Sequence, residues 1–108
     1  MKVLFWARNF RNALDQLDLP TGLTEIKEEA FCGSSSQYVD IPRSCTKIGS
    51  RAFADCTALR QVRIHSETSE ISLDAFEGCS TLLVIYCDEG SRAYEVAVEN
   101  EIRYVVVE

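Results

Sequence analysis

The hydrophobic and polar positions of this chain repeat with a period of 22 or 23 residues. The clearest unit begins with Val39-Asp40-Ile41, where apolar and polar side chains alternate as in a short, half-buried strand. A similar alternation occurs at residues 17–19, 62–64 and 85–87. A fixed period in the twenties is the mark of a solenoid, because each unit can bury its apolar side only against its neighbours. The pattern therefore predicts stacked coils, each containing one strand of a shared sheet.

Two further apolar features complete each unit. A single isoleucine, at positions 26, 48 and 71, follows the strand after a turn and is expected to point inward on the far side of the coil. An alanine–phenylalanine pair then comes at residues 30–31, 52–53 and 75–76. Within residues 50–59 the apolar positions recur at a spacing near three, which predicts one or two turns of helix.

These features together predict an α/β architecture. We expect a right-handed solenoid of about four coils, with a parallel sheet on one face and short helical turns and loops opposite. The side chains expected to point inward are Leu17, Leu19, Ile26, Phe31, Val39, Ile41, Ile48, Phe53, Leu59, Val62, Ile64, Ile71, Phe76, Leu82, Ile85 and Cys87.

The 108 residues fit one small domain whose two ends depart from the repeat. Residues 1–22 are expected to form an incomplete N-terminal repeat in which Phe5, Trp6 and Phe10 fill the end of the core. Residues 23–90 contain the repeats, and residues 91–108 are expected to cap the other end. Solenoids need such ends, because the last coil would otherwise expose its apolar face.

The C-terminal cap is predicted to be a helix followed by a strand. Ser91 can cap a helix from about Arg92 to Asn100, and residues 102–107 have the composition of a final strand. The apolar face expected for the helix consists of Ala93, Tyr94, Ala97 and Val98.

The second full repeat resembles a known family. Residues 48–64, with the sequence IGSRAFADCTALRQVRI, resemble the leucine-rich repeat of the BspA-like (Treponema pallidum) type. The unit of that family has isoleucine–glycine, alanine–phenylalanine, a cysteine, a leucine and a short strand ending in proline. The resemblance runs from about residue 12 to the C-terminus, and residues 85–102 resemble the helix-plus-strand end often found there. It departs at Glu28 and Ser72 in place of Gly49, at Ser34 in place of cysteine, and at His65 in place of proline.

The resemblance implies a function class and a location. Proteins of this type occur on bacterial and protozoan surfaces and bind partners through the coil, and the family carries no catalytic residues. A cell-surface or secreted location is therefore implied. However, the apolar stretch of residues 3–7 ends at Arg8 and is too short for an export signal. Either the protein stays inside the cell, or this chain is a piece of a longer precursor.

Charge and hydropathy exclude two classes of partner. The formal net charge is −6, and the 11 Lys and Arg residues are scattered, so binding to nucleic acid is not expected. No apolar run approaches the roughly 20 residues needed to cross a bilayer, so membrane insertion is not expected either.

The five cysteines lack metal-ligand spacing, and neither a zinc site nor any cofactor is predicted. Cys45, Cys56, Cys79 and Cys87 fall at repeat positions that suit buried packing thiols. Cys32 is equivalent to Glu77, which implies exposure to solvent and a reactive thiol. We expect a monomer that forms a Cys32-linked dimer on oxidation. A Cys56–Cys79 disulfide between adjacent coils is not excluded by distance.

Catalysis is not predicted. His65, the single histidine, follows Ile64 directly and is expected to be an outward-pointing surface or ligand-face residue. Cys87 is expected to point inward, so the two cannot form a nucleophilic pair. Glycoside hydrolysis requires two carboxylates that face each other across a cleft, and a small coil is expected to offer one exposed sheet instead.

The exposed sheet remains as the candidate site. Its outward side chains are expected to form a row of Asp18, Asp40, Arg63 and Tyr86, beside a second row of Pro20, Pro42, His65 and Asp88. The leading hypothesis is a non-enzymatic protein-interaction or adhesion module that binds a protein partner through Asp18, Asp40, Arg63, His65 and Tyr86. These residues also suit the plainer task of keeping the sheet soluble. The alternative is a structural segment that terminates a longer repeat protein and has no ligand of its own.

Overall fold

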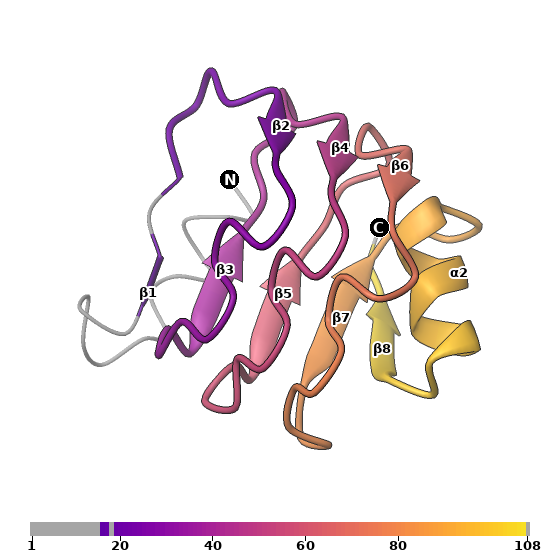
Figure 1. The fold of residues 1–108 in the computed structure, drawn as a ribbon. Coiled ribbons are helices and arrows are strands. Elements are labelled where there is room, and N and C mark those ends of the chain that lie inside the picture. The colour runs from indigo at the N-terminus through magenta and orange to yellow at the C-terminus, as the bar shows by residue number, and fades with distance from the viewer. Residues whose placement is uncertain (1–15, 18, 108) are drawn as a thin grey trace.

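The computed structural model of the chain describes residues 16–17 and 19–107, and its strands form two parallel sheets (Figure 1). The larger sheet has the order β1-β3-β5-β7-β8, and the smaller one has the order β2-β4-β6. The larger sheet consists of β1 (Gln16–Leu17), β3 (Tyr38–Asp40), β5 (Gln61–Arg63), β7 (Val84–Cys87) and β8 (Arg103–Val106). The smaller sheet consists of β2 (Glu25–Ile26), β4 (Lys47–Ile48) and β6 (Glu70–Ile71).

Strands from successive repeats lie side by side, which confirms the predicted solenoid of about four turns. In the larger sheet Val39 pairs with Val62 and Val62 with Ile85, and in the smaller sheet Ile26 pairs with Ile48. The chain runs from one sheet to the other and back in every coil. Equal sequence positions therefore stack along the axis of the solenoid.

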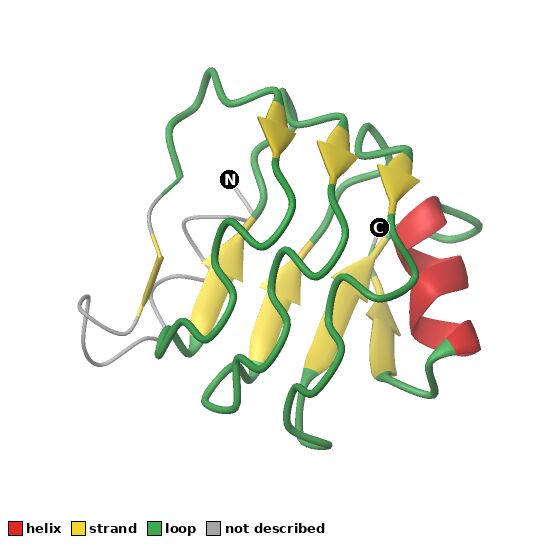
Figure 2. Cartoon of the chain, viewed as in Figure 1, coloured by secondary structure: helices red, strands yellow, loops and turns green. Residues whose placement is uncertain are grey.

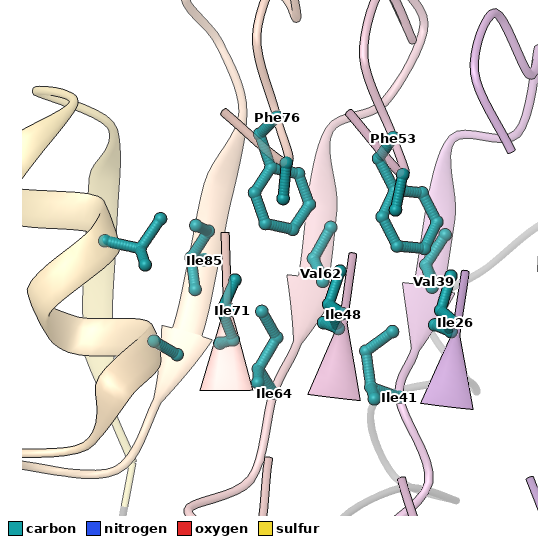
Figure 3. Packing of buried hydrophobic residues seen from close by; sticks show 14 of the residues in the cluster. Ile26, Val39, Ile41, Ile48, Phe53, Val62, Ile64, Ile71, Phe76 and Ile85 are labelled. Atoms are coloured by element: carbon teal, nitrogen blue, oxygen red, sulfur yellow. The ribbon is translucent and has the colours of Figure 1, made fainter. Parts of the chain in front are cut away.

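The core lies between the two sheets and is formed by the residues that the period predicts (Figure 3). Val39, Val62 and Ile85 contribute from the larger sheet, opposite the isoleucines of the smaller one, and each is at most 3% exposed. The rings of Phe53 and Phe76 stack at 5.5 Å between centroids, and Phe31 stacks on Phe53 at the same distance. This ring stack fills the region that neither sheet covers.

The segments that carry the phenylalanines are turns, so the predicted helical turns are wrong (Figure 2). Within residues 49–55 the N–H groups alternate between two kinds of partner. Ala52 and Ala54 donate to carbonyls three residues earlier, whereas Phe53 and Asp55 donate to carbonyls of the next coil. In an α-helix, all of these N–H groups would donate to carbonyls of the same segment, four residues earlier. Two residues are also incompatible with a right-handed helix, because they adopt left-handed backbone conformations. They are Arg51, with φ 55°, and Asp55, with φ 58°.

One predicted core position is wrong by a single residue. Leu82 is 50% exposed, and Leu83, at 1%, is buried instead. The Leu83 N–H bonds to the carbonyl of Ser80, whereas the corresponding turn in the previous coil runs from Cys56 to Leu59. The turn therefore begins one position later in the last coil, and the next leucine enters the core.

The C-terminal end has the predicted helix and strand. Helix α2 (Arg92–Glu99) begins at Ser91, whose side chain accepts a hydrogen bond from the Tyr94 N–H, and β8 pairs in parallel with β7. The helix lies at this end of the solenoid (Figure 1). Its buried residues are Ala93, Val96 and Ala97, while Val98 is 48% exposed, so the predicted apolar face is rotated by part of a turn.

The predictions for the N-terminal end lie outside the described residues, because Phe5, Trp6 and Phe10 fall within residues 1–15. At the first described coil, Leu17, Leu19 and Phe31 are half-buried and pack against the core.

Candidate functional site

The predicted row of outward side chains exists across three strands of the larger sheet. Asp40 pairs in register with Arg63, and Arg63 pairs with Tyr86, so the three residues are neighbours on adjacent strands. Val105 of β8 continues the row beyond Tyr86. Asp18, the first member of the predicted row, lies outside the described residues.

A parallel row precedes it on the same strands. Tyr38, Gln61, Val84 and Arg103 are in register, and the first three are half-buried while Arg103 is exposed. We call the two rows, together with His65 and Asp88 just beyond the strands, the outer face. Tyr38 and Val84 were absent from the predicted site, although the alternation that placed Asp40 and Tyr86 outward also places residues two positions earlier outward.

Arg63 is held by the protein itself and is only 8% exposed. Its guanidinium donates to the backbone carbonyls of Ile64 at 2.6 Å and Tyr86 at 3.2 Å, and to the Asp88 carboxylate at 3.1 Å. Arg63 therefore ties β5 to the end of β7. Both terminal nitrogens of the guanidinium already have partners, so Arg63 positions the outer face rather than offering an open charge.

Asp88 completes this tie. Its second carboxylate oxygen accepts the Ser66 N–H at 2.8 Å, which fixes the turn after β5. Although burial opposes it, the Ser66 N–H and the Arg63 guanidinium hold the pKa of Asp88 below its usual range. The sequence predicts Asp88 beside His65 but does not assign it this bridging role. The sequence feature that could have indicated this role is an acidic residue directly after β7, one repeat beyond Arg63.

His65 is buried, so its predicted exposure is wrong. Its residue exposure is 5%, and its Nε2 lies 3.9 Å from Oδ1 of Asp40, which is too long for a hydrogen bond. Burial, assisted by the positive charges of Arg63 and Arg43, lowers the pKa of His65 to about 4. At neutral pH the imidazole is therefore uncharged.

Asp40 is a further partly buried titratable group of the outer face. Burial raises its pKa, and the opposing effect of Arg63 and Arg43 is smaller. Within the described part of the chain, its Oδ1 and the Nδ1 of His65 are buried atoms without a hydrogen-bond partner. A buried polar atom that makes no hydrogen bond carries a desolvation cost that no bond offsets.

Among residues 16–17 and 19–107, no three His, Cys, Asp or Glu side chains form a group that could hold a metal ion. The prediction that Cys87 points inward is confirmed, because this residue is fully buried in the core. None of the helices in this part of the chain has the length and apolar composition of a membrane span.

Comparison with known proteins gives one match. Searches of curated proteins and of solved structures found no match. The family model of the BspA type leucine rich repeat region, which contains six copies of the repeat, matches residues 7–101. That range includes the three stacked phenylalanines, both sheets up to β7 and helix α2. With its repeat period, its stacked parallel sheets and this match over most of its length, the chain belongs to the BspA-type leucine-rich repeat family.

Proposed function

We propose that this protein is a non-enzymatic protein-interaction module that binds a protein partner through the outer face. The family and the solenoid fold support such a module in general terms. The observation that carries the proposal is the register of the outer face, which sets Asp40, Arg63 and Tyr86 side by side on three strands.

The contacts of Arg63 support a rigid recognition surface. Because Arg63 binds the carbonyl of Tyr86 and the carboxylate of Asp88, the backbone of the two strands is fixed before a partner arrives. Fixing a surface in advance lowers the entropy cost of binding. Tyr86, Tyr38 and Val84 then supply aromatic and aliphatic contact area, of the kind enriched at interface centres.

A photo-crosslinking experiment tests this proposal. A benzophenone amino acid replaces Tyr86 in one variant and Leu73 in a control variant, since Leu73 is 48% exposed but lies on the far side of the coil, after β6. Both variants are irradiated in an extract of the source cells, and adducts are identified by mass spectrometry. We expect one protein to crosslink through position 86 and not through position 73. Equal labelling from both positions, or no adduct from position 86, would contradict the proposal.

A surface-associated or secreted location belongs to the same proposal and rests on the family resemblance. Proteolysis of intact source cells tests it. Loss of the protein from cells whose cytoplasmic markers stay intact would support a surface location, whereas full protection would contradict it.

The C-terminal end favours a second candidate, a structural segment that terminates a longer repeat array. Helix α2 buries Ala93, Val96 and Ala97 against the last coil, and β8 continues the larger sheet. For this candidate, removal of residues 91–108 abolishes cooperative unfolding while position 86 captures no protein. Capture through position 86 would favour the interaction module instead.

A further inference from the structure

Cys56 and Cys79 occupy the same position in adjacent coils. Each lies three residues after a phenylalanine of the ring stack, and the rings of Phe53 and Phe76 are 5.5 Å apart. The Cys56 sulfur lies 3.2 Å from the carbonyl oxygen of Phe31, and the Cys79 sulfur lies 3.1 Å from that of Phe53. The two side chains therefore point in the same direction from neighbouring coils.

The two thiols also interact with each other. A hydrogen bond from Cys79 lowers the pKa of Cys56 to about 7, although burial opposes it, and the same bond raises the pKa of Cys79. The proton of this hydrogen bond therefore stays on Cys79, and Cys56 is the thiol that ionises first. In contrast, burial raises the pKa of Cys45 and of Cys87, whose thiols are fully buried and bond only to backbone carbonyls.

The pair can be reached from solvent through Cys79. Cys56 is 1% exposed, but Cys79 is half-buried, which corrects the expectation that both are packed away in the core. Cys79 is among the residues that line a hollow of about 430 Å³ beside the last coil, together with Phe76, Leu83 and Ile102. A small reagent that enters this hollow meets the sulfur of Cys79 before that of Cys56.

The spacing of the coils suits a covalent bond between these positions. Neighbouring parallel strands lie about 4.8 Å apart, and the Cα atoms of disulfide-bonded cysteines are usually about 4.4–6.8 Å apart. Both cysteines are free thiols in this structure. Closing the bond requires each sulfur to rotate away from the backbone carbonyl that it now contacts.

We propose that Cys56 and Cys79 form a reversible dithiol site, which small disulfide compounds oxidise through the hollow at Cys79 to an intercoil disulfide. Cys56 first loses its proton to solvent. As the Cys79 sulfur attacks one sulfur of the small disulfide RSSR, the Cys79 proton passes along the hydrogen bond to the Cys56 thiolate, a mixed disulfide forms at Cys79 and RS⁻ leaves. Cys56 then loses its proton to solvent, attacks the Cys79 sulfur and releases a second RS⁻. The two cysteines are oxidised and one RSSR is reduced to two thiols.

Mass spectrometry of a variant that lacks the exposed thiol tests the proposal. Cys32→Ser removes the exposed cysteine, and the full-length chain is incubated with 2-hydroxyethyl disulfide. We expect the intact mass to fall by two hydrogens with no adduct, peptide mapping to join Cys56 to Cys79, and dithiothreitol to restore the original mass. The closing rate should rise about tenfold per pH unit below pH 7 and level off above it, because Cys56 must be ionised before it can accept the Cys79 proton.

Two double variants separate this pair from other thiols. Cys32→Ser with Cys56→Ser should keep a stable adduct on Cys79, because the resolving thiol is absent. Serine suits this position, since Ser34 occupies it in the first coil. Cys32→Ser with Cys45→Ser should still close. Four free thiols after incubation of the single variant, a lasting adduct there without closure, or loss of two hydrogens in the variant without Cys56 would each overturn the proposal.

Discussion

At the scale of single residues, the phenylalanine stack shows how much one buried side chain contributes to stability. Phe53 is fully buried, and its ring stacks between those of Phe31 and Phe76. Neighbouring coils cannot close a gap there without breaking the hydrogen bond from the Phe53 N–H to Ala75. A cavity left by truncating Phe53 therefore persists instead of collapsing, and it lowers the free energy of unfolding by its full amount.

Phe53→Ala should lower the free energy of unfolding by about 3–5 kcal/mol, the range for truncating a buried phenylalanine. The measurement is urea denaturation followed by circular dichroism. Leu82→Ala is the matched control because Leu82 is half-exposed, and it should change stability by no more than about 0.5 kcal/mol. Equal midpoints for the two variants would contradict the burial of the ring stack.

His65 should make stability depend on pH. The folded state holds the pKa of His65 at about 4, below the ordinary histidine value of 6.5, so the unfolded chain binds a proton more readily between these values. The free energy of unfolding should therefore fall as pH drops from 6.5 to 4, by about 3 kcal/mol at most. Asp40, whose raised pKa acts in the opposite direction, reduces the net effect.

His65→Gln isolates this contribution, because glutamine does not titrate. The difference in unfolding free energy between the native chain and the variant should be constant above pH 7 and should shift in favour of the variant as pH falls to 4. A pH-independent difference would mean that His65 is not held neutral by the fold.

Single residues of the candidate site also show what the sequence can and cannot predict. The two-residue alternation places Asp40, Arg63 and Tyr86 on one face, and the structure agrees. The same alternation could not show that His65 is buried, because burial depends on how neighbouring side chains lie over it. It could not show either that Arg63 uses its donors internally on carbonyls and Asp88.

At the scale of elements, the connecting turns carry the strictest packing requirement. A Cβ atom added to Gly49 would lie 2.9 Å from the backbone nitrogen of Glu28 and 3.1 Å from the carbonyl carbon of Lys27. These are backbone atoms of the preceding coil and cannot swing aside. The Gly49 N–H also donates to the Ile26 carbonyl at 2.8 Å, so the two coils are held at this distance.

Gly49→Ala should therefore destabilise the protein by about 1–3 kcal/mol, as overpacking does elsewhere. Gly22→Ala is the control, since a Cβ there meets no atom within 4 Å. Thermal unfolding should show a lower midpoint for Gly49→Ala alone. If both variants melt together, the close approach of the coils at Gly49 is not a constraint.

Elements were predictable where the repeat is regular and less so where a turn shifts. The strands, the helix cap at Ser91 and the final strand follow from periodicity and capping chemistry. The turns that replaced the predicted helices do not, because their N–H groups bond partly to another coil, and spacing within one segment carries no information about such partners. The exchange of Leu82 for Leu83 has a similar cause, a turn that starts one residue later.

At the scale of the whole molecule, stability should vary along the axis. The central strand β5 has a paired strand on each side, whereas β8 pairs only with β7 among the strands described. In solenoids each repeat is stabilised mainly by its nearest neighbours, so inner coils open less often than outer ones.

Native-state hydrogen exchange should report this gradient. The amide of Ile64, which donates to the Tyr86 carbonyl of the next coil, should exchange more slowly than that of Val107, which donates to Cys87 at the edge. Uniform protection of both amides would indicate that the chain opens only as a single unit.

The alternating hydrogen bonds of the turns also bear on how such a protein can change length. Each coil offers its successor the same set of donors and acceptors that it receives from its predecessor, as the bonds from Phe31 to Ala52 and from Phe53 to Ala75 illustrate. A duplicated stretch of DNA that adds one complete unit would therefore find ready-made partners on both sides. A single inserted codon would instead reverse which side chains face inward in the strand it enters. Lineages that carry this gene should thus gain and lose whole repeats far more readily than individual residues.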